Sequence, residues 1–305
     1  MIGRLYIRKS TSPDSPSKQQ RIESSSTSKK DRYRDILPFV ENRVTLSDGQ
    51  YINASYMPNF TGSNHRAFIA CQGPLHSTIG DQWEMIWAEK VKAVFAIGKL
   101  YEGKTEKFAQ YWPSSDTVRQ MHAGTQFQLE LVSEEKVDEL IVRRLVHVTR
   151  IGATGPSQKQ SVIVYHFTDW PDHTAIESRD LLSLVKRMHM FRTSFPENPV
   201  VVHCSAGVGR TGCALTMTHV IEAIEGALGT EPHLAISDSS LSILTTAINL
   251  RRYRLYMMQT TDQYISVFRT TGFLLDDYAR RQNHQHPHRE TPSLIPDLPV
   301  DELRY

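Results

Sequence analysis

A cysteine and an arginine six positions apart, Cys204 and Arg210, have the types and the spacing of a nucleophile and a phosphate-binding group. The apolar residues 200–202 before them predict a short buried strand, and the apolar residues that follow predict a helix. Gly207 and Gly209 allow the connecting loop to turn tightly, so that successive N–H groups point inward. The start of the helix adds free N–H groups and the positive end of its dipole. Such a loop binds a phosphate-like dianion.

The thiol of Cys204 is predicted to be ionised at neutral pH. A free cysteine has a pKa of about 8.5, and a helix N-terminus with a nearby cation lowers it by several units. The planar guanidinium of Arg210 can hold two phosphoryl oxygens at once, which a lysine ammonium cannot do. The alternative interpretation is a buried structural cysteine, because cysteine is often buried. His203, Thr211 and the two loop glycines, at their spacings, favour a catalytic loop.

Residues 203–212, with the sequence HCSAGVGRTG, resemble the signature of the tyrosine-specific protein phosphatases, His-Cys-x5-Arg-Ser/Thr. They do not match a Walker nucleotide loop, because no Gly-Lys-Ser/Thr follows the glycines. The resemblance implies that Cys204 attacks phosphorus and that Arg210 holds the phosphoryl group. It also implies that Thr211 stabilises the departing thiolate and that His203 orients the loop. The implied phosphate-binding residues of the loop are Ser205, Ala206, Gly207, Val208 and Gly209.

The tripeptide Trp-Pro-Asp that ends at Asp172 resembles the acid loop of the same family. Hydrolysis of an aryl phosphate requires a proton for the leaving phenolate, and a carboxylic acid above the pocket provides it. An aspartate before the helix predicted over residues 176–191 is alternatively a helix cap. The family continues Asp-x-Gly-x-Pro, whereas Thr174 and Ile176 stand at the Gly and Pro positions here. These two departures leave the hinge behaviour of the loop open.

Two further stretches resemble the family's substrate-recognition motifs. KDRYRD, over residues 30–35, is similar to Lys-Asn-Arg-Tyr-x-Asp, with Asp31 in place of Asn. The resemblance implies that Tyr33 stacks on the phenyl ring of the substrate, and that Asp35 accepts hydrogen bonds from the peptide backbone. KFAQYWP, which begins at Lys107, is similar to Lys-Cys-x-x-Tyr-Trp-Pro. This match implies that Lys107 lies near the mouth of the phosphate site.

Residues 254–264, with the sequence RLYMMQTTDQY, resemble the family's Arg-x-Gly-Met-Val-Gln-Thr-x-x-Gln-Tyr. The match implies that Gln259 positions the water that hydrolyses the phosphocysteine, and that Gln263 assists near the same site. Tyr256 stands where glycine is usual at the rim of the pocket. A bulky ring at this position is expected to narrow the entrance.

The resemblance covers residues 29–275 and implies one catalytic domain. The implied fold is a single α/β domain: a twisted mixed β-sheet flanked by α-helices, with the phosphate-binding loop between a strand and a helix. Alternating β-branched residues over 125–132, 139–151 and 160–167, joined by turn-rich segments, predict an antiparallel meander within it.

Composition restricts the function classes. The 305 residues carry 35 Lys and Arg against 33 Asp and Glu, which gives no support for a nucleic-acid partner. No apolar run approaches the roughly 18 residues needed to insert into a membrane. Three cysteines form an odd and sparse set, which argues against a disulfide scaffold and favours a reducing, cytoplasmic location. Cys71 is interpreted as a buried thiol. We expect neither a metal nor another cofactor, and no feature indicates an oligomeric state.

Both ends of the chain have the composition of disordered tails. Residues 1–28 are basic and rich in Ser, Lys and Pro, so a solvated tail is expected, with a weak docking arm as the alternative. Residues 276–305 hold four prolines and the alternate histidines His284, His286 and His288. Three histidines without further ligands are weak evidence for a metal site, and disorder is the better interpretation.

Taken together, the motifs predict hydrolysis of phosphotyrosine in protein substrates through a cysteinyl phosphate. Two other classes stay open. A dual-specificity or phosphoinositide phosphatase shares Cys-x5-Arg, but the Tyr33 motif argues against the first, and the apolar Ala206 and Val208 argue against the second. A weakly active or non-catalytic phosphotyrosine-binding module would rest on the altered acid loop and on Tyr256.

Overall fold

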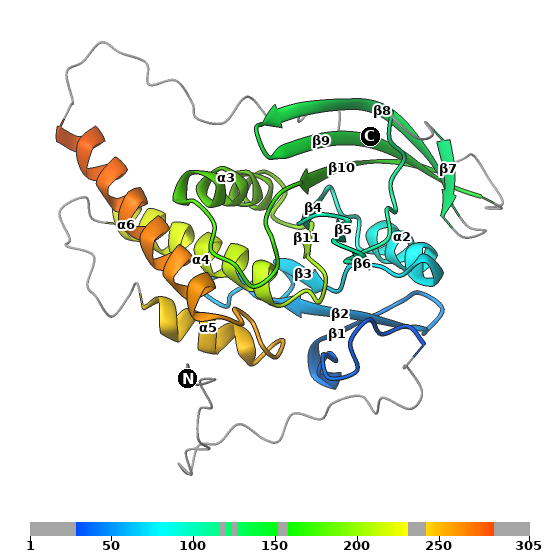
Figure 1. Ribbon diagram of the computed structural model, residues 1–305, viewed down its shortest axis with the longest axis horizontal. Helices are drawn as coiled ribbons and strands as arrows, with labels where there is room; N and C mark the ends of the chain where they lie inside the picture. The colour runs from blue at the N-terminus through cyan, green and yellow to red at the C-terminus, as the bar shows by residue number, and fades with distance from the viewer. Residues whose placement is uncertain (1–28, 116–119, 124–126, 152–157, 231–241, 284–305) are drawn as a thin grey trace, which may run out of the picture.

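A computed structural model of the chain describes residues 29–115, 120–123, 127–151, 158–230 and 242–283 (Figure 1). Within them, nine strands form one sheet in the order β1-β2-β3-β11-β4-β10-β9-β8-β7. The strands are β1 (Arg43–Thr45), β2 (Tyr51–Met57), β3 (Phe68–Cys71), β4 (Ala93–Ile97), β7 (Gln120–Ala123), β8 (Phe127–Asp138), β9 (Ile141–Arg150), β10 (Lys159–Phe167) and β11 (Val200–His203). A separate hairpin is formed by β5 (Tyr101–Glu102) and β6 (Thr105–Glu106).

The sheet is mixed, as expected. Its centre is parallel, since β11 pairs in parallel with β3 and β4, and β4 pairs in parallel with β10. The strands from β10 through β9 and β8 to β7 pair antiparallel, which confirms the predicted meander. Strand β8 continues to Asp138, well past the predicted end at residue 132, with register shifts in its pairing to β9. Such shifts let a long strand bend while it stays paired.

Helices cover both faces of this sheet. Helix α2 (Ile79–Ala88) lies on one side and directly follows a 3₁₀ turn at His76–Thr78. Another 3₁₀ turn, at Val40–Asn42, precedes β1. On the other side Figure 1 shows a group of four: α3 (Ser178–Ser194), α4 (Gly209–Thr230), α5 (Ile243–Arg251) and α6 (Thr261–Asn283). Because successive side chains of a strand point to opposite faces, Val200 and Val202 join the core under this group. Val201 joins the core under α2, so β11 is buried on both sides.

Two predicted boundaries are corrected. The helix after the acid loop begins at Ser178 instead of 176, because the loop itself continues through Ile176. The last helix continues to Asn283, so residues 276–283 are helical and do not belong to a tail. Tyr278 packs against the core, and this contact extends the helix beyond the predicted end of the domain at 275. Residues 1–28 and 284–305, with their three histidines, lie outside the described residues.

Candidate active site

The phosphate loop, defined here as residues 203–209, connects β11 to the N-terminus of α4 at the carboxyl end of the parallel strands. Cys204 follows the last residue of β11 and its side chain is buried. Gly207 has φ +72°, and a Cβ there would lie 1.9 Å from the carbonyl oxygen of Cys71, so no other residue fits. A Cβ on Gly209 would lie 2.7 Å from Oε1 of Gln259. The glycines therefore permit the close packing that the sequence pattern implied.

Arg254 holds the outer side of the phosphate loop. Its fully buried guanidinium donates from Nε to the carbonyl of Gly207 at 3.0 Å and from Nη2 to that of Ala206 at 3.0 Å. Nη2 also donates to Oδ1 of Asn53 on β2 at 2.7 Å. With these carbonyls turned outward, the N–H groups of the loop are left to face an anion on its inner side.

The uncharged imidazole of His203 holds the start of the phosphate loop. Its Nδ1 lies 3.0 Å from the carbonyl oxygen of Cys204, and its Nε2 lies 2.8 Å from the hydroxyl of Tyr111. Burial lowers the pKa of His203 to about 4, so the ring carries no charge at neutral pH. The hydroxyl of Tyr111 therefore donates to Nε2, and Nδ1–H donates to the loop carbonyl. The ring is therefore hydrogen-bonded to the backbone at Cys204, and its orienting role stays a prediction.

The electrostatics at Cys204 favour a thiolate. Burial alone would raise the pKa of the thiol, but the charge of Arg210 and the hydroxyl and N–H of Thr211 outweigh it. The pKa of Cys204 is therefore lowered, although the nearby Asp172 opposes the shift. Among the described residues the Thr211 hydroxyl has no other hydrogen-bond partner, so it is available to the sulfur.

Arg210 joins the loop to the acid loop. Its fully buried side chain donates from Nη1 to the carbonyl of Trp170 at 2.7 Å and to Oε1 of Glu102 at 3.0 Å. Its Nη2 lies 3.3 Å from Oδ1 of Asp172. A Cβ on Gly98 would lie 2.1 Å from Nη1, so that glycine leaves room for the guanidinium. Arg210 thus interacts electrostatically with the predicted nucleophile Cys204 and pairs with the predicted acid Asp172.

Asp172 is held between two cations. Besides Arg210, Nζ of Lys107 lies 3.1 Å from Oδ2 of Asp172 and 3.3 Å from Oε2 of Glu102. Glu102 also accepts from the backbone N–H of Asp172 at 3.2 Å. Burial raises the pKa of Asp172, but Arg210, Lys107 and His173 lower it further than burial raises it. Without substrate, Asp172 is therefore an ionised partner of the two cations.

The recognition segment, residues 30–35, stands beside the phosphate loop. The hydroxyl of Tyr33 lies 2.9 Å from Oγ of Ser205, which itself donates to the carbonyl of Lys107 at 2.9 Å. Tyr33 is half-buried against the core, whereas Asp35 is exposed. Asp31, at the position of the family's Asn, accepts through Oδ1 from Nδ2 of Asn53 at 2.8 Å. The tyrosine thus forms one wall above the loop, and Asp35 stays accessible to a peptide.

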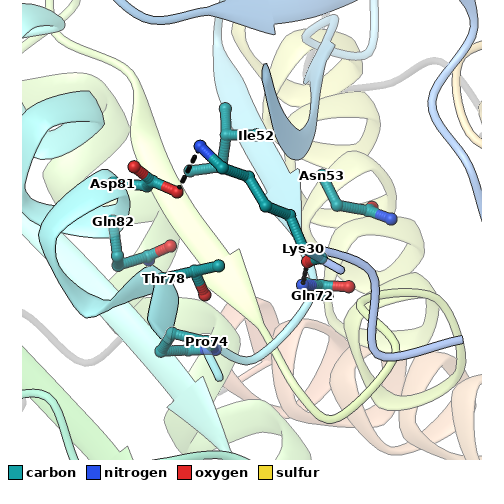
Figure 2. Close-up of a pocket in the computed structure, with 8 residues that line it drawn as sticks. All are labelled: Lys30, Ile52, Asn53, Gln72, Pro74, Thr78, Asp81 and Gln82. Carbon is teal, nitrogen blue, oxygen red and sulfur yellow. Dashed lines mark hydrogen bonds and ion pairs between the residues drawn. The ribbon is translucent and has the colours of Figure 1, made fainter. Parts of the chain in front are cut away.

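A pocket behind the recognition segment shows how that segment is anchored (Figure 2). Gln72 donates to the carbonyl of Lys30 at 2.7 Å and accepts from the N–H of Arg32 at 2.8 Å. The Lys30 side chain crosses the pocket, and its Nζ lies 3.0 Å from Oδ2 of Asp81 on α2. The pocket is lined by Lys30, Ile52, Asn53, Gln72, Pro74, Thr78, Asp81 and Gln82. These contacts fix the backbone just before Tyr33.

The segment of residues 254–263 reaches the loop from the other side. Oε1 of Gln263 accepts from the N–H of Gln259 at 2.8 Å and from the N–H of Thr260 at 3.2 Å. Nε2 of Gln263 is buried without a partner among the described residues, and it would lie 2.9 Å from a Cβ on Gly209. The side chain of Gln259 is exposed beside the same glycine. Both glutamines therefore adjoin the phosphate loop at Gly209.

Tyr256 occupies a backbone conformation that favours glycine. Its φ is +62°, and its side chain is 44% exposed. Neither Tyr256 nor Asp35 forms a side-chain hydrogen bond or ion pair within the part of the chain that the structure describes. Within the described residues these two predicted binding residues have no side-chain bond to the phosphate loop, and their roles stay predictions.

Glu102 and Arg254 were not assigned roles from the sequence. Arg254 opens the matched motif of residues 254–264, so its position was a usable signal. Glu102 lies in a two-residue strand with no motif around it, and its partners Lys107, Arg210 and Asp172 come from three different segments. Only the folded chain brings these four charges together.

A family model described as protein-tyrosine phosphatase matches residues 27–271. The chain belongs to the protein-tyrosine phosphatase family. It is 34% identical to receptor-type tyrosine-protein phosphatase eta of Gallus gallus over 77% of this chain and 16% of that protein. It is 33% identical to tyrosine-protein phosphatase 3 of Dictyostelium discoideum over 90% of this chain and 28% of that protein. The chain thus spans less than a third of the length of these curated relatives.

Solved structures of the same family have the same fold. The catalytic domain of human protein tyrosine phosphatase non-receptor type 18 aligns with a TM-score of 0.71 at 28% identity, over 84% of this chain and 88% of that chain. PTPN18 in complex with HER2 phosphopeptides aligns with a TM-score of 0.73 at 27% identity, over 85% and 86% of the two chains. The expected single α/β domain, with a mixed sheet between helices, is confirmed. None of the helices in the described residues has the length and apolar character of a membrane span.

Proposed function

We propose that the chain hydrolyses phosphotyrosine in proteins through a cysteinyl-phosphate intermediate. This proposal rests on three functional groups that lie close together at the start of α4. The thiol of Cys204 has a lowered pKa, Arg210 is beside it, and Asp172 lies 3.3 Å from the guanidinium. A nucleophile, an oxyanion-binding group and a separate proton donor are the minimum that this reaction requires.

In the first step, the sulfur of Cys204 attacks phosphorus while the tyrosyl oxygen leaves. The N–H groups of the loop and the guanidinium of Arg210 hold the phosphoryl oxygens and stabilise the charge of the transition state. Asp172 gives its proton to the tyrosyl oxygen. Because the dianionic substrate takes over the charge of Arg210, binding removes one cause of the low pKa of Asp172 and favours the protonated acid.

In the second step, a water molecule attacks the cysteinyl phosphate. Gln259 positions the water, and Asp172, now ionised, accepts its proton. The hydroxyl of Thr211 stabilises the thiolate of Cys204 as the S–P bond breaks. Gln263 supports this arrangement, because it accepts from the backbone N–H of Gln259.

The substrate class follows from the wall above the loop. The hydroxyl of Tyr33 lies 2.9 Å from Oγ of Ser205, which supports a wall that selects a group as long as a phosphotyrosyl ring. The exposed Asp35 is available to the peptide backbone on either side of that ring. The alignment with PTPN18 in complex with phosphopeptides supports phosphotyrosine-containing proteins as partners. A dual-specificity phosphatase, which must admit shorter side chains, is less well supported by this wall.

We further propose that the catalytic domain runs from residue 29 to 283 and works in a reducing, cytoplasmic compartment. The three cysteines are free, and the reaction needs the Cys204 thiol in its reduced state. Residues 1–28 and 284–305 lie outside this proposed range and outside the described residues.

The decisive experiment compares the purified chain with Cys204→Ser on phosphotyrosine, phosphothreonine and phosphoserine peptides. We expect turnover of phosphotyrosine only, no turnover by the variant, and peptide binding by both proteins. Cys71→Ala is the matched control: burial raises the pKa of Cys71 to about 12, so its thiol stays protonated and its loss should leave turnover intact. An inactive parent, or a turning-over Cys204→Ser variant, contradicts the proposal. Parent activity on all three peptides favours a dual-specificity enzyme.

A further inference from the structure

The acid loop, residues 170–176, is attached to α6 by a hydrogen bond that the usual family residue could not form. The backbone N–H of Ile176 donates to Oγ of Ser266 at 3.0 Å. Ile176 stands at the position where the family pattern has proline, and proline has no N–H. Oγ of Ser266 in turn donates to the carbonyl of Asp262 at 3.0 Å, so its acceptor side is directed at the loop.

Bonds within the loop connect this attachment to the acid. Nε1 of Trp170 donates to the carbonyl of Thr174 at 3.1 Å, and Oγ1 of Thr174 donates to the carbonyl of Pro171 at 2.8 Å. The segment that contains Asp172 is therefore bonded to itself on both sides of the acid. Because these hydrogen bonds tie the backbone together on both sides of Asp172, we expect a displacement of Ile176 to move Asp172 as well.

The two ends of the loop are held by different parts of the molecule. At the front, the carbonyl of Trp170 accepts from Arg210 at 2.7 Å. At the back, Ser266 is only 2% exposed on a helix that packs against α3 and α4, and the Ile176 side chain packs against the same core. Ser266 is thus a buried point of attachment at the back of the loop. The middle of the loop is held by the ion pairs of Asp172 and by a hydrogen bond from Oγ1 of Thr260 to the carbonyl of His173 at 3.3 Å.

We propose that Ser266 is a positioning residue for the reaction: through the N–H of Ile176 it holds the acid loop where Asp172 faces Arg210 and the phosphate loop. The inference rests on the proposed role of Asp172 as the proton donor. Ser266 does not touch the substrate. It shortens the time that Asp172 spends away from the leaving oxygen, and so affects the step that needs the proton.

The test uses two aryl phosphates, one that releases an acidic nitrophenol and one that releases unsubstituted phenol. A poor leaving group needs the proton of Asp172 more than a good one does. Ser266→Ala removes the acceptor and keeps a good helix former. We expect kcat on phenyl phosphate to fall between about twofold and tenfold, as for the loss of one hydrogen bond, with KM unchanged. On the nitrophenyl substrate, kcat should fall less.

Three further variants separate positioning from a general loss of structure. Ile176→Pro removes the donor and should act like Ser266→Ala, with no added effect when both are combined. Ile176→Val keeps the N–H and should act like the parent. Thr270→Val removes a neighbouring hydroxyl bond of α6, from Oγ1 to the carbonyl of Ser266 at 2.7 Å, without reaching the acid loop. Thr270→Val should cause no loss of kcat that differs between the two aryl phosphates.

The final comparison is made in the Asp172→Asn background, where no proton can be donated. There Ser266→Ala should change kcat on neither substrate. An equal loss on both substrates, a loss that persists in this background, or no loss at all overturns the positioning role. If the parent is inactive, or if Asp172→Asn leaves it fully active, the proposed function fails together with this inference. A silent Ser266→Ala in an active, Asp172-dependent parent overturns the inference alone.

Discussion

The phosphate loop and the acid loop approach the same place from opposite sides, but they are held in different ways. The phosphate loop is buried, and its carbonyls are bonded by Arg254, by Gly73 at 2.8 Å and by Met258 at 3.0 Å. The acid loop has hydrogen bonds at its two ends, but its acid is held by charges, with Asp172 paired to Arg210 and Lys107. Backbone bonds in a buried site change little when the substrate binds, whereas ion pairs can be exchanged for substrate contacts.

This difference assigns the two loops different tasks. The phosphate loop must present its N–H groups before the charge of the transition state develops, and rigidity serves that purpose. The acid loop must release Asp172 from its cations and deliver a proton, so its contacts have to be replaceable. Arg210, on α4, interacts with both loops, because its charge acts on Cys204 and its Nη1 donates to the carbonyl of Trp170. Substitutions on each side should therefore fail in different ways.

The largest effect is expected for Arg210→Lys, which keeps the charge and loses the planar fork. An arginine at a phosphoryl-transfer transition state contributes about 10³-fold to 10⁵-fold to the rate, and we expect kcat/KM to fall within that range. Arg144→Lys is the control, because Arg144 is also buried but pairs with Glu134 on β8, away from the loops. A comparable loss of kcat/KM in the control would mean that stability, not phosphate binding, explains the result.

Asp172→Ala should lower kcat by about 10²-fold to 10⁴-fold on a phosphotyrosine peptide, the usual contribution of a general acid. Binding should be retained, because the phosphate loop is unchanged and Arg210 is released to the substrate. The measurement is kcat together with the Kd of the same peptide for a Cys204→Ser, Asp172→Ala double variant. A parallel loss of peptide affinity would show that Asp172 acts in binding and not as the acid.

The pH profile distinguishes the two loops, because one must supply a deprotonated group and the other a protonated one. Cys204 must be ionised, which limits the rate at low pH, and Asp172 must be protonated, which limits it at high pH. Lys107 is one of the cations that lower the pKa of Asp172. Lys107→Met should therefore raise the pKa of Asp172 and move the alkaline limb of kcat/KM to higher pH.

Lys99→Met supplies the matched control for this shift. Lys99 pairs with Asp169 at 3.0 Å, just before the acid loop, and has no contact with Asp172 among the described ion pairs. Its profile should coincide with that of the parent. An alkaline limb that stays in place in Lys107→Met, or moves to lower pH, contradicts the assigned charge arrangement.

The two loops also differ in how far the sequence predicts them. The phosphate loop is one contiguous run, so its residues, its strand and its helix could all be predicted from local pattern. The ionised state of Asp172 could not, because it depends on Arg210 and Lys107, which only the folded chain brings beside it. Likewise, the composition of the chain after residue 275 suggested a tail, although the packing of Tyr278 keeps α6 helical. Long-range contacts decided each of these points.

The smallest expected effect lies at the rim, where Tyr256 stands at the family's glycine position. A non-glycine residue in the left-handed region costs about 1–2 kcal/mol, and the φ of Tyr256 is +62°. Tyr256→Gly should therefore raise the Tm by a few degrees. It should also open the entrance, so that kcat/KM rises a few-fold on phosphopeptides with bulky residues beside the phosphotyrosine. A small aryl phosphate occupies only the inner pocket and should be turned over as by the parent.

Tyr256→Ala separates the two consequences, because it removes the ring and keeps a side chain at positive φ. It should reproduce the gain on bulky phosphopeptides without the full rise in Tm that glycine gives. Tyr256 is 44% exposed, so both variants remove a ring that is partly in solvent. An equal change on the small and the bulky substrates, or a loss on the peptides alone, would show that the ring does not narrow the entrance. In that case Tyr256 affects only stability, and peptide selection falls to the recognition segment with Tyr33 and Asp35.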